Sequence, residues 1–323
     1  MIERFTGQLP AWARPTHPVL RHELGTGSVR LPWQARYGRA LGVVLVGALL
    51  LLIGVLAATD LFRRAAGQNS VETVNAILYF PALIVQVILR VAAFALTSGT
   101  VGEQIRLGNW DNLRATESGA ELTLRAKWVS VFYRLRGLFG VVIALRVGLI
   151  GLLLYDLTAF QGRYLDLFIV GITPEVPLVL AVLLLSLLMT AVLLLPVTAA
   201  GFDAAMGLLL SASVQQRTYT TLLQAVYILV RIGILVLVVG TAETFLRGEL
   251  PATDPVAWLL LFALGALGDW GLAFLYLGRF GEIWAIVPYG ILLGLAILIF
   301  SLIQAALADA VLAFAARRAQ RRG

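Results

Sequence analysis

The 323-residue sequence contains no cysteine. This absence excludes disulfides, thiol catalysis, iron–sulfur clusters and zinc–thiolate sites. Both histidines, His17 and His22, precede the first apolar run, so a haem or metal held by histidine inside a membrane is excluded as well. The single lysine, Lys127, lies in Arg125-Ala126-Lys127-Trp128, whereas a Walker A loop requires Gly-Lys-Ser/Thr. The chain therefore cannot bind ATP by that device. We expect neither an enzyme nor a cofactor on this chain.

Charged residues are also scarce. They make up 13% of the chain, against 60% hydrophobic residues, and the mean hydropathy is +0.90. In soluble domains about a quarter of all residues are charged. This composition predicts an all-α polytopic membrane protein. The net charge of +7 comes almost entirely from arginine, and its expected partners are anionic membrane lipids and not nucleic acid.

Composition divides the chain into three parts. Residues 1–40 hold six arginines against Glu3 and Glu23, which predicts a cytoplasmic, interfacial N-terminal segment. Residues 41–316 are expected to form the transmembrane domain, and residues 317–323 a basic cytoplasmic tail.

Apolar runs in the central part each approach the roughly 20 residues that a helix needs to cross a 30 Å hydrocarbon core. They are expected at about 41–58, 74–97, 138–156, 177–196 (continuing as a weaker helix to Arg217), 219–242 and 283–308. A further run, 256–277, is interrupted by Gly265, Gly268, Asp269 and Gly271, which favours a re-entrant or broken hairpin. We therefore expect six crossings with both chain ends in the cytoplasm. The alternative, seven crossings, would place the basic tail outside, against the positive-inside bias.

The longest polar interval between apolar runs is residues 101–136, which carry ten charged residues. Residues 103–115 have the spacing of a surface helix with Trp110 at head-group depth, interrupted at Gly108. Ser118-Gly-Ala-Glu121 then has the spacing of a capping box, which predicts a second helix leading into the third span. A stiff helix joined to a span can transmit a push; the alternative is an ordinary amphipathic loop.

This interval resembles the cytoplasmic signature of the type-II ABC exporter permeases. The matching positions are Glu103, Gly108, Trp110, Asp111, Leu113, Thr116 and Lys127. Two positions depart from the family pattern: its Gly-Thr is Gly108-Asn109 here, and its Thr-Pro is Thr116-Glu117.

Two other stretches resemble the same family. His17-Pro-Val-Leu-Arg-His-Glu-Leu24 is similar to its Asn-Pro-Val-Leu-x-x-Glu-Leu opening, with Pro18, Arg21 and Glu23 as the interfacial motif. The stretch from Gly207 to Ser211 is similar to the Gly-Leu-x-x-Ser that closes the family's fourth span.

The resemblance implies a permease subunit of an ATP-driven exporter in a prokaryotic cytoplasmic membrane. It would dock a separately encoded ATPase, which binds ATP and Mg, through residues 101–128, and would pair with a second permease protomer, identical or not. The implied ATPase-coupling residues are Glu103, Arg106, Gly108, Asn109, Trp110, Asp111, Leu113, Thr116 and Lys127. The alternative function is a non-transporting membrane subunit that anchors or assembles a larger complex.

Arginines also fall inside the predicted spans, and ionisable residues there are functional hypotheses by default. They are Arg90, Arg146 and Arg231, and no Asp or Glu is expected within the same spans to neutralise them. One interpretation is that Arg90 and Arg146 extend to cytoplasmic lipid phosphates. The other is that all three line an inward cavity for an anionic or lipid-like cargo.

Overall fold

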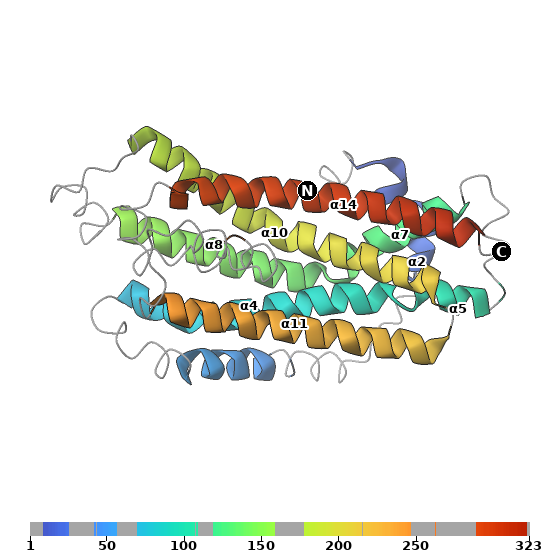
Figure 1. The fold of residues 1–323 in the computed structure, drawn as a ribbon, viewed down its shortest axis with the longest axis horizontal. Helices are drawn as coiled ribbons and strands as arrows, with labels where there is room; N and C mark the ends of the chain where they lie inside the picture. The colour runs from blue at the N-terminus through green and yellow to red at the C-terminus, as the bar shows by residue number, and fades with distance from the viewer. Residues whose placement is uncertain are drawn as a thin grey trace.

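The computed structural model describes residues 9–25, 42, 44–56, 70–106, 108, 119–158, 178–214, 216–246, 262 and 289–321. Within these ranges the chain is helical and contains no strand. The all-α prediction is confirmed. The helices run largely along the long axis of the molecule, as a bundle (Figure 1).

The described helices follow the order of the predicted spans. They are η1 (Ala11–Ala13), α2 (Pro18–Glu23), the segment Val44–Leu56, α4 (Ser70–Thr97), α5 (Thr100–Arg106), α7 (Gly119–Arg134), α8 (Arg136–Thr158), α10 (Leu178–Ser213), α11 (Arg217–Leu246) and α14 (Tyr289–Arg321). In this part of the chain four helices are long and apolar enough to cross a membrane, or up to five if the bent pair α7–α8 forms one span. The chain thus has the helices of a multi-pass membrane protein.

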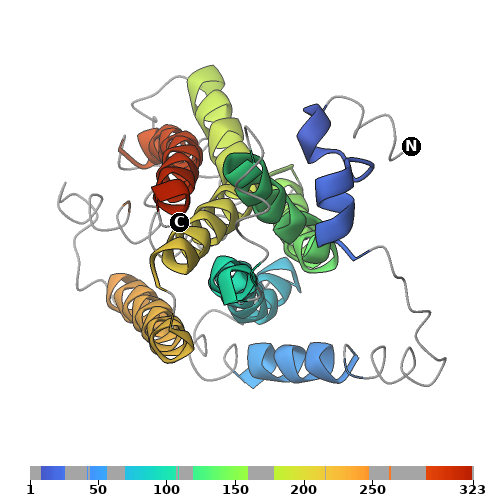
Figure 2. The same ribbon diagram turned by 90° about the vertical axis from the view of Figure 1, so that its right-hand side faces the viewer.

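Helix α10 is the centre of the bundle and contacts α4, α5, α7, α8 and α14 (Figure 2). Its buried positions are rich in small side chains, among them Ala191, Ala199, Ala200, Ala204, Ala205 and Ala212. In a membrane, where apolar burial does not drive helix association, small residues let helices approach closely. Pro196 lies inside α10, and the helix continues past it as predicted.

The close approach is tightest where α10 meets the end of α4. A Cβ added to Gly207 would overlap Thr97 Oγ1 and lie 2.8 Å from the carbonyl oxygen of Phe94. One turn and a half earlier, the Trp128 ring of α7 lies against Gly201, and its Nε1 donates a hydrogen bond of 2.7 Å to the Gly201 carbonyl oxygen. Glycine at these positions therefore sets the distances between α10 and its neighbours.

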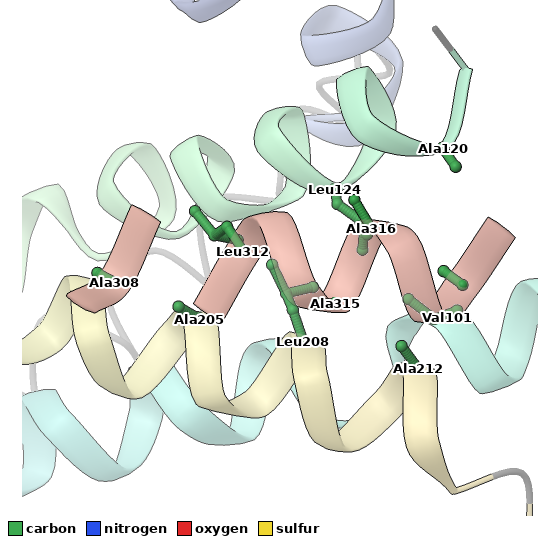
Figure 3. Close-up of a cluster of buried hydrophobic side chains, with 11 residues drawn as sticks. Val101, Ala120, Leu124, Ala205, Leu208, Ala212, Ala308, Leu312, Ala315 and Ala316 are labelled. Carbon is green, nitrogen blue, oxygen red and sulfur yellow. The ribbon is translucent and has the colours of Figure 1, made fainter. Parts of the chain in front are cut away.

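Helices α2, α5 and α7 gather at one end of the bundle (Figure 1). There α7 turns into α8 through a bend of 58° next to Leu135. Buried side chains of α5, α7, α10 and α14 form one apolar cluster, in which Val101, Leu124, Leu208 and Leu312 meet (Figure 3). Helices α5 and α7 are thus packed into the bundle. The surface helix predicted over 103–115 lies mostly outside the described residues and stays a prediction.

Two predictions on the C-terminal part have different outcomes. The run 256–277 lies outside the described residues, apart from Phe262, so the choice between a crossing and a re-entrant hairpin stays a prediction. Arg317, Arg318 and Arg321 of the predicted basic tail are part of α14, which ends at Arg321.

The contact at Gly207 predicts a sharp positional effect. Gly207→Ala should destabilise the chain by about 1–3 kcal/mol, because the added methyl group meets the α4 backbone in a packed interior. The measurement is unfolding of the purified chain in mixed micelles. The matched control is Gly148→Ala in α8, where a Cβ meets nothing within 4 Å and alanine should be neutral or stabilising. Equal stability of both variants would contradict the close packing.

Candidate functional site

The predicted coupling residues begin on α5. Glu103 is exposed there, Arg106 is the last residue of the helix, and Gly108 follows it in a turn. Gly108 has φ +68°, and its N–H donates to the Ile105 carbonyl oxygen at 3.1 Å. This left-handed conformation favours glycine and ends a helix. The predicted interruption at Gly108 is therefore confirmed.

The middle of the predicted coupling segment lies outside the described residues. It comprises Asn109, Trp110, Asp111, Leu113 and Thr116, together with Ser118 of the predicted capping box. The described residues resume at Gly119, the first residue of α7, which directly follows the predicted cap residue Ser118.

Lys127, the one lysine of the chain, is buried and paired. Its Nζ lies 2.8 Å from Glu23 Oε1, and the two side chains are 5% and 13% exposed. Gln104 of α5 donates from Nε2 to the same carboxylate oxygen at 3.5 Å. A single carboxylate on α2 thus joins the two described ends of the polar interval. The sequence predicted Lys127 and Glu23 in separate motifs and not their contact.

The rest of the N-terminal motif explains why α2 lies there. Pro18 is its first residue, where the missing N–H costs nothing, and Arg21 is exposed. Leu20 is fully buried against Ala13 and Val129. This apolar contact seats α2 on α7 and brings Glu23 to Lys127.

Hydrogen bonds to the backbone of the N-terminal segment also hold α2 against α7. Tyr133 Oη donates to the Ala13 carbonyl oxygen at 3.1 Å, and Arg134 Nη2 donates to the Glu23 carbonyl oxygen at 2.5 Å. Both donors belong to the last turn of α7, directly before the bend. The described residues 9–25 are therefore tied to α7 at Ala13 and at the Glu23 backbone, and not only at Lys127.

On α10, three residues at four-residue spacing share one face, which we call the α10 stripe: Asp203, Gly207 and Ser211. Ser211 Oγ accepts hydrogen bonds from the backbone N–H groups of Val101 at 2.8 Å and Gly102 at 3.3 Å. These N–H groups belong to the first turn of α5, which has no partners within its own helix. Gly207 and Ser211, noted in the sequence only by resemblance, thus hold the junction of α4 and α5.

Asp203, at the membrane end of the α10 stripe, binds two arginines. Its Oδ2 lies 2.7 Å from Arg90 Nε on α4, and its Oδ1 lies 2.5 Å from Arg231 Nη2 on α11. The Asp203 side chain is 1% exposed. The expectation that no acid neutralises these arginines is therefore wrong.

Aromatic rings complete this group. Arg231 Nε donates to Tyr227 Oη at 3.0 Å, and the Tyr227 ring stacks on Phe94 with centroids 3.9 Å apart. Among the described residues, the group thus joins two guanidinium groups, one carboxylate and one phenol from three helices.

Arg146 lies elsewhere. It is fully buried on α8 and donates from Nη1 to the carbonyl oxygen of Val192 on α10. Val192 precedes Asp203 by eleven residues of α10, or about 16 Å at 1.5 Å per residue. Arg90 and Arg146 are both buried in the structure. Whether the three arginines line one cavity stays a prediction.

Metal binding has no support in this geometry: across the described ranges, no three His, Asp or Glu side chains gather to hold a metal ion. Comparison of the chain with protein families, with curated proteins and with solved structures finds no match.

The Lys127–Glu23 pair predicts a coupled effect of mutation. Lys127→Met and Glu23→Leu should each destabilise the chain by about 3–5 kcal/mol, because each leaves a buried charge without its partner. The double variant should cost much less than the sum, since it removes both charges. Unfolding in mixed micelles measures all three.

The control for that cycle is the exposed pair of Glu121 and Arg125 on the same helix, 2.9 Å apart. Glu121→Gln should change stability by less than about 1 kcal/mol. Additive losses at Lys127 and Glu23 would show that the two do not interact.

The Asp203 group predicts an asymmetry between its members. Asp203→Asn should cost about 3–5 kcal/mol, since it removes the carboxylate that two buried arginines share. Arg231→Met should be far milder, because Arg90 and Asp203 then remain as a one-to-one pair. Folded yield after detergent extraction and unfolding in micelles measure both. An Asp203→Asn chain as stable as the Arg231→Met chain would contradict the shared carboxylate.

Proposed function

We propose that this chain is the transmembrane permease subunit of an ATP-driven ABC exporter that docks a separately encoded ATPase through residues 101–128. The observation that carries the proposal is that both described ends of this interval are mechanically joined to the intramembrane helices. Ser211 of α10 holds the first turn of α5, and Trp128 of α7 donates to the Gly201 carbonyl oxygen of α10. A force applied between α5 and α7 would therefore act on the bundle.

Two routes lead from this end of the bundle into the membrane. Helix α7 continues through its 58° bend into α8. Along α10, Ser211 and Asp203 are eight residues apart, about 12 Å of rigid helix. At Asp203 the second route reaches α4 and α11 through Arg90 and Arg231. These are the contacts that a coupling element needs in order to shift the spans between inward and outward states.

The proposed assembly contains two permease protomers around a two-fold or pseudo-two-fold axis, with a pair of ATPases supplying ATP and Mg. An anionic or lipid-like cargo is proposed because Arg90 and Arg231 place two guanidinium groups among the spanning helices. In this proposal the coupling segment and the N-terminus face the cytoplasm of a prokaryotic cell.

Docking can be tested by crosslinking from one introduced cysteine, since the chain has none of its own. Asn109→Cys, carrying a benzophenone maleimide, should crosslink on illumination to a separately encoded ATPase that has a Walker A loop. The expected yield depends on nucleotide, because ATP binding would move the docked ATPase. Mass spectrometry of the adduct identifies the partner.

The control is Gln68→Cys, in the loop predicted on the opposite membrane surface, which should give no such adduct. Labelling of the Asn109→Cys variant from outside intact cells by an impermeant maleimide would overturn the proposal, because no cytosolic ATPase could reach that position. Arg231→Met, which keeps the Arg90–Asp203 pair, should still crosslink but export less. Crosslinking without ATP-dependent flux would favour the non-transporting anchor subunit.

A further inference from the structure

A polar cavity of about 310 Å³ lies at the end of the bundle, between the α4–α5 turn, α5, the end of α10 and the start of α11. Among its lining residues only Val214 has a purely hydrocarbon side chain of any size; the rest are polar, charged or glycine. Helices α4 and α11 are both apolar enough to span a membrane, and the cavity lies at their ends. Its position and lining fit a polar ligand at head-group depth.

The cavity presents one anion and one cation. Glu103 of α5 and Arg217, the first residue of α11, both line it and both are exposed. Within the described part of the chain neither side chain forms an ion pair, with the other or with a third residue. Two opposite charges that face one space without meeting leave room for a ligand that carries both signs.

The two threonine hydroxyl groups in the wall have already donated their hydrogens. Thr220 Oγ1 donates to the Gln216 carbonyl oxygen at 3.2 Å, and Thr221 Oγ1 donates to the Arg217 carbonyl oxygen at 3.0 Å. A hydroxyl has one hydrogen and two lone pairs. These threonines can therefore only accept further hydrogen bonds, so they favour a ligand rich in N–H donors.

Ser98, after the end of α4, and Gln224 of α11 also offer hydrogen-bond acceptors to the cavity. Ser98 Oγ donates to the Ala95 carbonyl oxygen at 3.3 Å and accepts from Gln224 Nε2 at 2.5 Å. The amide oxygen of Gln224 is an acceptor. Together with the Glu103 carboxylate, the lining offers several acceptors and one strong cationic donor, Arg217.

We propose that this cavity binds a phosphoethanolamine head group. The primary ammonium, with three N–H donors, meets Glu103 and the threonine oxygens, and the phosphate meets the Arg217 guanidinium, which favours phosphate oxygens. A choline group has no N–H to donate, and a glycerol group has no positive charge for Glu103. Tyr219, exposed on α11 beside the cavity residues, has the amphipathic ring common at the membrane interface. The site requires no ATPase and does not depend on the proposed function.

The test measures which lipid the purified full-length chain retains. The chain is reconstituted in vesicles of equal parts phosphatidylethanolamine, phosphatidylcholine and phosphatidylglycerol, extracted, and analysed by native mass spectrometry. The wild type should retain phosphatidylethanolamine about tenfold over phosphatidylcholine, the difference that charge-assisted hydrogen bonds supply. Glu103→Gln should remove that preference, and Arg217→Gln should reduce retention of both lipids.

Two exposed charges outside the cavity serve as matched controls: Glu121→Gln and Arg318→Gln make the same changes in net charge and should bind lipid as the wild type does. Circular dichroism verifies that all four variants are folded. Equal retention of the two zwitterionic lipids by the wild type, or an unchanged preference in Glu103→Gln, would overturn the proposal.

Soluble and membrane sources of the head group are separated by titrating the delipidated chain. Binding of O-phosphoethanolamine that depends on Glu103 and Arg217 would support a soluble ligand. Binding of dioctanoyl phosphatidylethanolamine alone, with the same dependence, would support a lipid. If neither binds, the assignment of the cavity is wrong.

Discussion

The carboxylate of Asp203 is the constraint on which the arrangement of the intramembrane helices depends. A charged side chain is costly in a low-dielectric interior unless it is paired. Asp203 therefore requires Arg90 of α4 and Arg231 of α11 to lie next to its carboxylate, on one face of α10. For α11 this requirement decides its position, because the most apolar stretch of this helix, within Arg217–Leu237, buries none of its residues against the rest of the structure. Three contacts attach it to the bundle: a hydrogen bond from Gln224 to Ser98, stacking of Tyr227 on Phe94, and the ion pair of Arg231 with Asp203.

At the end of the bundle the same rule applies to Lys127 and Glu23. Burial of the only lysine forces α2 onto α7, and the apolar contact of Leu20 makes that position stable. At both of its described ends the polar interval is helical. Its described ends are built into the core through an ion pair, the Ser211 contacts with α5, and the apolar cluster with α14. This construction ties the described ends of the interval to the bundle.

Prediction from sequence succeeded where the signal is local. The turn at Gly108 follows from the backbone freedom of glycine, and the continuation of α10 past Pro196 follows from unbroken apolar character. It failed where the signal is a contact between distant residues. Asp203 lies 113 residues from Arg90, and no pattern along the chain relates the two. The same holds for the Lys127–Glu23 pair, although both residues were singled out by motif.

By itself the sequence determined the class of structure, because long apolar runs in an aqueous cell have few solutions other than helices in a membrane. It also excluded thiol chemistry and a Walker A loop, since the required residues are absent. Only the tertiary structure decided which charges are partners, which helix is central and where a polar cavity opens. Those properties depend on the packing distances between helices, which glycine and alanine positions on α10 set in three dimensions.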